Sequence, residues 1–199
     1  MTTPQIVLAS ASSARRTLLA AAGVVFDVTT AAIDEAAIKA SARAEGASAV
    51  DTAILLAELK AARIARTDPR LVIGADQLLV CNDEWFDKPG DIDDARAQLT
   101  RLRGQHHRLV TAIVCFRDGQ RIWHHVAQPL LTMRAFSDDF LTGYLAAEGE
   151  HITTTVGAYR LEGLGAQLFD AIEGEYAAVL GLPLLALLGF LRQQMLLQA

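Results

Sequence analysis

The apolar run at residues 71–81 constrains the fold more than any other segment of this chain. Its interruptions are Gly74, Asp76 and Gln77. A strand that faces solvent on one side alternates apolar and polar residues, whereas a strand covered on both faces is apolar nearly throughout. We therefore predict a central strand that is covered on both faces and into which polar chemistry is set.

The segments around this run alternate between strand and helix patterns. Asn82-Asp83 indicates a turn, and Asp118-Gly119 predicts a hairpin. Predicted strands cover 5–9, 24–28, 71–81, 107–117, 121–135 and 152–155. Predicted helices cover 13–22, part of 31–45, 48–66, 91–103, 137–148, 166–172 and a last segment from Pro183. This interleaving predicts an α/β or mixed α+β fold with a partly antiparallel sheet.

Composition narrows the classes of partner. The 199 residues carry 18 Lys and Arg against 23 Asp and Glu, a net charge of −5. No broad basic face is available for nucleic acid, so phosphate chemistry must use a few placed cations. The most apolar segment, 179–191, is shorter than a membrane span, and the N-terminus lacks a signal-peptide pattern. We expect a cytoplasmic protein that binds neither nucleic acid nor membranes.

The cysteines and paired histidines do not have the spacing of a metal site. Cys81 and Cys115 are isolated, and we expect both to be buried strand residues. Histidines adjacent at 106–107 and at 124–125 point to opposite faces of a strand, whereas zinc ligands come as spaced sets. We therefore predict no zinc site.

The segment 8–15 is a candidate phosphate site. Small residues that include Ser10 and Ser12 end a predicted strand, and Arg15 lies in the first turn of the next helix. Amides and hydroxyls at a helix N-terminus attract anions, and a guanidinium adds a forked set of donors. The local pattern alone favours an ordinary helix cap followed by a solvated arginine.

Asp76 is the strongest catalytic candidate. A carboxylate inside an apolar strand must be paired, bound to a metal or shifted in pKa to offset its desolvation. The alternative is a structural carboxylate that backbone amides satisfy. Lys88, held in its loop by Pro89, and Lys60, in mid-helix, are on their own more typical of solvated lysines.

A glycine-punctuated loop at 157–165 carries one carboxylate, Glu162. No strand-to-helix unit surrounds this loop, so it resembles a dinucleotide fingerprint only superficially. Glu162 either hydrogen-bonds a ligand base or is an exposed loop acid. For the aromatic pair Trp85-Phe86, just before Lys88, we favour a role in anchoring the loop over a role in binding.

Eight sequence blocks, in order, resemble the Maf-like nucleotide pyrophosphatase family from Ile6 to about Arg192. They are LASASSARRTLL (8–19), IDE (33–35), LAELKA (56–61), VIGADQ (72–77), KPG (88–90), GQHHRLVTA (104–112), VGAYRLEGLGA (156–166) and IEGEYAAVLGLP (172–183). The resemblance implies a single Maf-like domain over 1–199. The implied fold is elongated, two-lobed and inosine-triphosphatase-like, with a long mixed sheet flanked by helices and a cleft between the lobes.

The resemblance also implies an activity, a metal and an oligomer. Family members hydrolyse a nucleoside triphosphate to the monophosphate and pyrophosphate, use a divalent cation (Mg²⁺ or Mn²⁺) and are frequently homodimers. Asp76 corresponds to the proton acceptor, and Glu35 with Asp76 would hold the metal. The implied phosphate-binding residues are Ser10, Ser12, Arg15, Lys60 and Lys88.

Four departures from the commonest family pattern bear on the base. The branch similar to 7-methyl-GTP pyrophosphatases shares Gln77 and Glu162 and lacks the arginine and lysine that others carry at Ala14 and Thr155. A carboxylate can accept from guanine's N1–H and 2-amino group, whereas a pyrimidine offers it an acceptor. Ala14, Gln77 and Glu162 are thus the predicted specificity residues, and 7-methyl-GTP the predicted substrate of a housecleaning activity.

Two alternatives stay open. Ala14 stands where the 7-methyl-GTP branch often has a tryptophan, so an expected stacking surface is missing, and Tyr159 and Leu161 resemble the dTTP/UTP pyrophosphatase branch. The other alternative is a nucleotide-binding regulator of septum formation, in which binding matters and turnover is incidental.

Overall fold

A computed structural model describes residues 4–198 and divides the chain into two compact units. The first unit comprises Met1–Gln77, Thr111–Ala127 and Glu175–Ala199. The second comprises Leu78–Val110 and Gln128–Gly174. The single domain, the elongated two-lobed shape and the cleft stay predictions.

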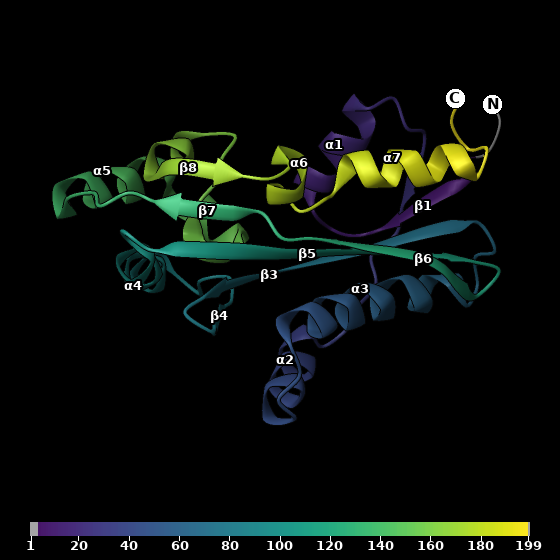
Figure 1. Cartoon of the computed structure of the whole chain (residues 1–199), viewed down its shortest axis with the longest axis horizontal. Coiled ribbons are helices and arrows are strands. Elements are labelled where there is room, and N and C mark those ends of the chain that lie inside the picture. The colour runs from purple at the N-terminus through teal and green to yellow at the C-terminus, as the bar shows by residue number, and fades with distance from the viewer. Residues whose placement is uncertain (1–3, 199) are drawn as a thin grey trace. The chain divides into compact units, whose positions relative to one another are not determined.

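The strands form one mixed sheet, as predicted (Figure 1). Its hydrogen-bonded path is β2-β1-β3-β5-β7-β8, with β4 paired to β3 and β6 paired to β5. β1 runs parallel to β2 and β3, whereas the β3–β4, β5–β6, β5–β7 and β7–β8 pairs are antiparallel. The strands are β1 (Ile6–Ala9), β2 (Asp27–Val28), β3 (Leu71–Cys81), β4 (Glu84–Phe86), β5 (His106–Arg117), β6 (Gln120–Ala127), β7 (Leu130–Met133) and β8 (Phe169–Glu173).

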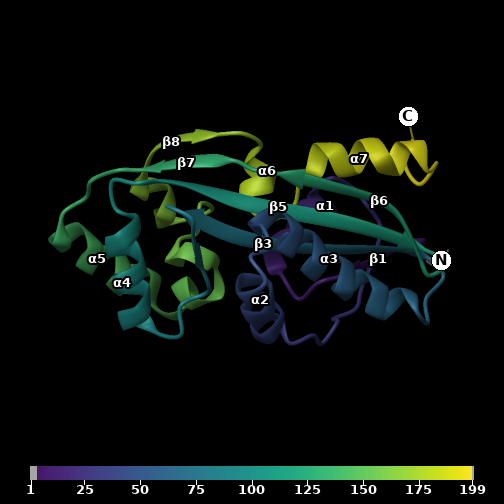
Figure 2. The ribbon, with the colours of Figure 1, turned by 60° about the horizontal axis from the view of Figure 1, so that its bottom comes forward.

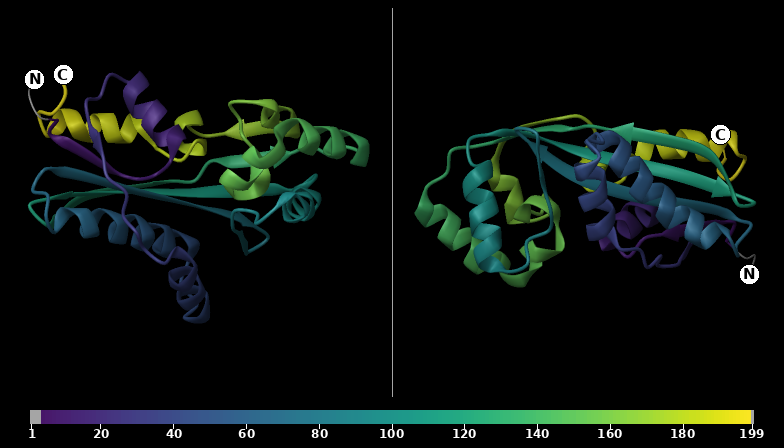
Figure 3. Two further views of the ribbon diagram at one scale, coloured as in Figure 1. Left: turned by 180° about the vertical axis from the view of Figure 1, so that it is seen from behind. Right: turned by 90° about the horizontal axis from the view of Figure 1, so that it is seen from below.

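In the first unit, helices cover both faces of the sheet (Figures 1 and 3). α1 and α7 lie on one face, and α2 and α3 lie on the other. Their bounds, together with those of the short helix α6, are α1 (Ser13–Ala21), α2 (Glu35–Ala44), α3 (Ala49–Ala65), α6 (Tyr176–Val179) and α7 (Leu184–Gln193). The predicted fold class, a mixed α/β fold with a sheet flanked by helices, is confirmed.

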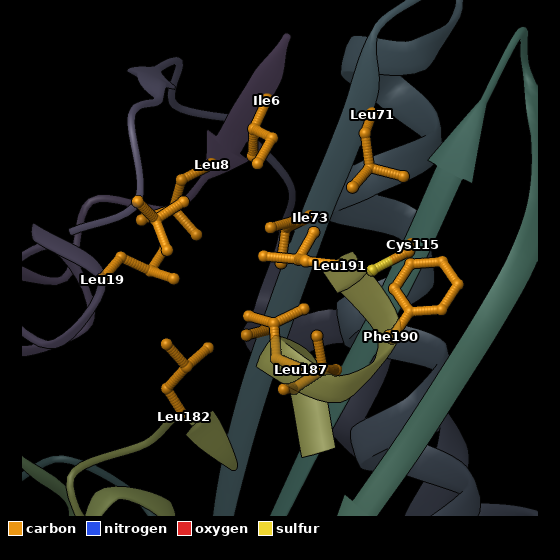
Figure 4. Packing of buried hydrophobic residues seen from close by; sticks show 13 residues of the cluster. Ile6, Leu8, Leu19, Leu71, Ile73, Cys115, Leu182, Leu187, Phe190 and Leu191 are labelled. Carbon is orange, nitrogen blue, oxygen red and sulfur yellow. The ribbon is translucent and has the colours of Figure 1, made fainter. Parts of the chain in front are cut away.

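The apolar core of this unit lies between the sheet and α7 (Figure 4). Ile73 and Ala75 of β3 belong to it, together with Leu187 and Leu191 of α7. Since successive strand residues point to opposite faces, the odd-numbered residues of β3 meet this core and the even-numbered residues face away from it. This alternation places Asp76 on the face of β3 opposite to α7.

In the second unit, α4 packs against α5 and against the 3₁₀ turns η1 and η2 (Figure 2). The third 3₁₀ turn, η3, packs against α5 and β8. The bounds are α4 (Ile92–Leu102), α5 (Asp138–Glu148), η1 (Gly149–Thr154), η2 (Val156–Ala158) and η3 (Leu164–Leu168). Side-chain caps start α4 and α5, because Asp91 accepts from Asp94 N and Ser137 from Phe140 N.

Four sequence predictions differ from the structure. Residues 152–154 of the strand predicted at 152–155 lie in η1, and the helix predicted at 166–172 is the end of η3 followed by part of β8. The long strand at 121–135 is two strands, because Pro129 lies between them and has no N–H for a ladder. The turn predicted at Asn82-Asp83 is a two-residue hairpin turn, with φ values of 50° and 63°. The strand that follows it, β4, was not predicted.

The cysteine prediction is confirmed. Cys81 in β3 and Cys115 in β5 are both buried and unpaired. Among residues 4–198, no helix has the length and apolar character needed to cross a bilayer.

Candidate active site

Gly74 lets α3 approach β3 closely. A Cβ atom built on Gly74 would lie 2.1 Å from the carbonyl oxygen of Ala57 and 2.9 Å from Cβ of Ala61. Any other residue at this position would therefore push the helix away from the strand. Since Gly74 and Asp76 share a face of β3, the same contact brings Asp76 next to α3.

Lys60 of α3 meets two carboxylates. Its Nζ lies 2.6 Å from Oδ1 of Asp76 and 2.7 Å from Oε1 of Glu35, the first residue of α2. Asp76 is 4% exposed and Lys60 is 9% exposed, whereas the Glu35 side chain is 44% exposed. Asp76 is thus paired with a side-chain cation, and the interpretation of Lys60 as a solvated lysine is wrong.

Arg15 is buried beside this group. Its Nε donates to the carbonyl of Gly181 at 2.7 Å, and its Nη1 donates to the carbonyl of Ala75 at 2.8 Å and to Oγ of Ser10 at 3.2 Å. Burial lowers the pKa of Arg15, and the negative charges of Asp76 and Glu35 act against that shift. The alternative of a solvated arginine is therefore wrong, and three of the five guanidinium N–H groups bond to protein atoms.

Ser12 and Ala14 occupy the turn that leads into α1. Oγ of Ser12 accepts from the amide of Arg15 at 3.3 Å, and the Ser12 amide donates to Oγ of Ser10 at 3.2 Å. Ser12 and Ala14 are half-buried. Ser12 thus caps the helix as the simpler interpretation expected, and its predicted contact with phosphate stays a prediction.

The carboxylates suit a divalent ion that keeps outside ligands. Oδ2 of Asp76 is buried and has no hydrogen-bond partner within residues 4–198. That stretch contains no group of three or more His, Cys, Asp or Glu side chains placed to hold a metal ion. Mg²⁺ is commonly bound through one or two carboxylates, with water and substrate phosphates completing its shell. Glu35 and Asp76 fit such an ion better than a cage made of protein ligands alone.

Gln77 points away from Asp76, toward the helices on the other face. Its Nε2 lies 2.8 Å from Oγ1 of Thr111, 3.0 Å from the carbonyl of Ala178 and 3.1 Å from that of Val179. Asp76 and Gln77, although consecutive in β3, therefore bond to different helices on opposite faces of the sheet.

Lys88 and Glu162 belong to the second unit, and both are exposed. Lys88 lies between β4 and α4, and Glu162 lies between η2 and η3. Phe86 is buried, and the guanidinium carbon of Arg101 lies 4.7 Å from the centre of its ring. Phe86 thus anchors the loop that carries Lys88, in agreement with the interpretation favoured for the aromatic pair.

Sequence patterns missed three residues near these positions. Thr111 interrupts the apolar strand β5, which is the same signal that identified Asp76. Glu148 ends α5, where a negative charge opposes the helix dipole. His107 is 1% exposed, and its Nε2 lies 2.9 Å from the hydroxyl of Tyr159. No local pattern distinguishes His107 from its exposed neighbour His106.

Comparison with known proteins identifies the family. The family model described as "Maf-like protein" matches residues 5–194. A nucleoside triphosphate pyrophosphatase of Granulibacter bethesdensis is 58% identical over 95% of this chain and 96% of its own. A 7-methyl-GTP pyrophosphatase of Rhizobium etli is 47% identical over 96% of each chain.

A solved structure gives a weaker match. The nucleoside-triphosphatase (dITP/XTP pyrophosphatase) of Mycobacterium abscessus is 14% identical, with a TM-score of 0.42, over 66% of this chain and 74% of its own. A likeness of this strength carries no conclusion about this chain. The family model and the sequence relatives, each spanning nearly the whole length, show that the chain belongs to the Maf-like family.

Proposed function

We propose that this protein hydrolyses 7-methyl-GTP, or a related modified guanine nucleotide, to the monophosphate and pyrophosphate. Its relatives named as nucleoside triphosphate pyrophosphatases place the chain among hydrolases that act on phosphoric anhydride bonds. The observation that carries the proposal is the Lys60 ammonium held between Asp76 and Glu35, with Arg15 buried in the field of the same carboxylates.

Asp76 is the proposed proton acceptor. Its Oδ1 is held by Lys60, while Oδ2 is buried and has no partner among the described residues. A water molecule that donates to Oδ2 would be oriented toward the α-phosphorus, and its proton would pass to that oxygen during attack. Lys60 fixes the carboxylate in one orientation, so Asp76 needs little reorganisation at that moment.

The cations of the site would stabilise the negative charge that develops on the phosphates during the reaction. Cleavage between the α- and β-phosphates places negative charge on phosphate oxygens and on the departing pyrophosphate. Lys60 and Arg15 supply fixed positive charge at the first unit, and Lys88 is proposed to add a third cation. Glu35 and Asp76 would hold Mg²⁺ or Mn²⁺, which supplies further positive charge beside the phosphates when bound.

The base preference is proposed from Glu162. A carboxylate accepts two hydrogen bonds from the guanine edge and favours the positive charge of a 7-methylated ring. The resemblance to the Rhizobium etli 7-methyl-GTP pyrophosphatase supports this choice. Gln77 marks the same branch, as does the absence of arginine at Ala14, although Ala14 also lacks the tryptophan that this branch often carries. The dTTP/UTP activity remains the competing proposal.

The central experiment measures which product leaves. Purified protein with Mg²⁺ or Mn²⁺ should release pyrophosphate and no orthophosphate from a nucleoside triphosphate. Asp76→Asn should lower kcat more than about a hundredfold while the circular dichroism spectrum stays native. Asp139→Asn, an exposed acid on α5, is the matched control. Unchanged turnover in Asp76→Asn would reject Asp76 as the proton acceptor, and tight binding without turnover in the wild type would favour the regulator.

Specificity is tested with a panel of 7-methyl-GTP, GTP, ITP, CTP, dTTP and UTP. We expect the highest kcat/KM for 7-methyl-GTP, and Glu162→Gln should lower that value selectively. An equal loss on every substrate would reject contact between Glu162 and the base, and a preference for dTTP and UTP would favour the other branch.

We also propose a cytoplasmic homodimer. Light scattering after gel filtration should give twice the 21.4 kDa mass of the chain, and fractionation of cells should recover the protein with soluble cytoplasmic enzymes. A monomer at micromolar concentration would reject the dimer.

A further inference from the structure

Three side chains from three elements bond to residues 178–181, the end of α6 and the start of its connection to α7, which we call the 178–181 turn. Gln77 of β3 donates to the carbonyls of Ala178 and Val179 at 3.0 and 3.1 Å. Thr111 of β5 donates to the carbonyl of Ala178 at 3.0 Å. Arg15 of α1 donates through Nε to the carbonyl of Gly181 at 2.7 Å. The turn is therefore bonded to β3, β5 and α1.

Thr111 determines how the Gln77 amide is oriented. Its side chain is wholly buried, and its hydroxyl hydrogen is given to the Ala178 carbonyl. A hydroxyl has one hydrogen, so Oγ1 meets Gln77 as an acceptor at 2.8 Å. The nitrogen end of the Gln77 amide then faces three oxygen atoms, and a flipped amide would place its oxygen against all three.

In this arrangement the N–H groups of Gln77 are already hydrogen-bonded to protein oxygens. A base that accepted a hydrogen bond from Nε2 would have to break contacts with this segment, including the one to the Val179 carbonyl, whereas the Ala178 carbonyl would keep its bond from Thr111. We therefore expect Gln77 to affect catalysis by holding this turn in place, and not by contacting the base.

The turn leads to Arg15. Gly181 has a φ of +95°, a conformation that favours glycine, and its carbonyl oxygen accepts from Arg15 Nε. A Cβ at Gly181 would also lie 3.3 Å from that nitrogen. The orientation of the guanidinium fork therefore depends on where the 178–181 turn is held.

We propose that Thr111 and Gln77 are positioning residues, which hold the 178–181 turn and through Gly181 orient the Arg15 guanidinium. The proposal deepens the proposed function, because it takes Arg15 as a phosphate ligand. It gives Gln77 an indirect role in phosphate binding, through Arg15, in place of direct recognition of the base.

The first measurement does not depend on activity. In wild-type protein the Arg15 Nε–H should exchange slowly with solvent, as observed by NMR of the arginine side chains. Thr111→Val removes the hydroxyl at nearly constant volume and should speed that exchange about tenfold or more, whereas Thr111→Ser should keep it slow. The control is Thr52→Val, since Thr52 of α3 is also buried and donates to the backbone carbonyl of Ser48, away from the turn.

The second measurement uses a ligand without a base. Thr111→Val and Gln77→Met should each weaken the binding of inorganic tripolyphosphate about tenfold, and the double variant should be no weaker than either single one. The same two variants should lower kcat/KM for 7-methyl-GTP, GTP and UTP by equal factors.

Two results would overturn the proposal. If Thr111→Val lowers Tm but leaves both the Arg15 exchange and the tripolyphosphate affinity unchanged, Thr111 is only structural. If Gln77→Met changes the ratio of kcat/KM between bases while Thr111→Val does not, Gln77 contacts the base. Failure of the wild type to release pyrophosphate would reject the proposed function and leave the exchange measurement valid.

Discussion

Asp76 and Glu162 are the proposed functional carboxylates of two regions, the charge cluster of Asp76, Lys60 and Glu35 and the glycine-rich loop, and the two regions support them differently. Asp76 is itself buried and bonded to Lys60. Glu162 is exposed, and the buried acid of its region is Glu148, whose Oε1 accepts from the Leu164 amide at 3.2 Å. Oε2 of Glu148 lies 3.6 Å from Nη1 of Arg160.

This difference separates two kinds of substitution. In the first region, Asp76 and the lysine that holds it are both buried charges, so a change there affects both rate and stability. In the loop, the residue proposed to contact the base is exposed, and the buried acid of its region is a different residue. Glu162 can therefore be replaced with little strain, and substrate preference can change while the cluster around Asp76 stays intact.

Removal of the Lys60 charge should have the largest effect. Lys60→Gln leaves Asp76 and Glu35 without the cation that they share, which we expect to lower the free energy of unfolding by about 3 kcal/mol. The loss of a fixed positive charge should lower kcat by about a hundredfold or more. Urea denaturation and pyrophosphate release measure the two effects. Arg63→Gln, an exposed cation on the same helix, should change neither, and a fully active Lys60→Gln protein would break the comparison.

A substitution that separates α3 from β3 should have the second largest effect. Gly74→Ala places a methyl group against the Ala57 carbonyl, and we expect a loss of stability of up to about 3 kcal/mol with about a tenfold lower kcat. The control is Gly189→Ala on α7, where an added Cβ has no neighbour within 4 Å and should be tolerated. Normal stability in Gly74→Ala would show that α3 can shift away from β3 at little cost, so that the close contact at Gly74 does not fix Lys60 against Asp76.

The second unit should lose stability in acid because of His107. Burial lowers the pKa of His107 to about 4 from an ordinary value of 6.5, and the charge of His106 adds to the shift. Between these values the unfolded chain binds a proton that the folded chain does not, so stability falls as pH falls from 6.5 toward 4. The shift amounts to up to about 3 kcal/mol.

Urea denaturation at pH 7.5 and pH 4.5 tests this effect. His107→Gln should reduce the difference between the two pH values by most of that amount, whereas His124→Gln, an exposed residue of β6, should leave it unchanged. Equal pH dependence in wild type and His107→Gln would mean that His107 is accessible to protons in the folded state.

The smallest effect is expected at Glu148. Glu148→Gln keeps an acceptor for the Leu164 amide but removes the charge near Arg160, which should cost about 1 kcal/mol. A loosened loop should lower the preference for 7-methyl-GTP over UTP by about threefold, measured as a ratio of kcat/KM values. The control is Glu150→Gln, an exposed acid in η1. A large fall in kcat for both substrates would show that the loop supports the reaction itself.

The first unit was more predictable from sequence than the second. Leu71–Cys81 and the helices that cover it have strong, regular patterns, and a lone carboxylate in such a strand is a clear signal. The tail of the second unit consists of short 3₁₀ turns and a five-residue strand, whose conformations depend on contacts such as that of Glu148 with Leu164. These contacts join residues 16 positions apart and leave no local periodicity.

Contacts between residues far apart in the sequence could not be predicted either. The family resemblance implied that Glu35, Lys60 and Asp76 belong to one site, but only the structure shows that one lysine nitrogen lies within bonding distance of both acids. The pairing of Gln77 with Thr111 had no sequence signal beyond a polar residue in each of two apolar strands.

The alternation of β3 makes the spacing of this strand as important as its composition. Asp76 and Gln77 are neighbours in the chain, yet one serves the lysine of α3 and the other the turn before α7. Deleting a single residue upstream within the strand would exchange their faces, burying the acid in the apolar core and turning the amide toward the lysine. In this protein, insertions and deletions in β3 should therefore be far less tolerated than substitutions at its apolar positions.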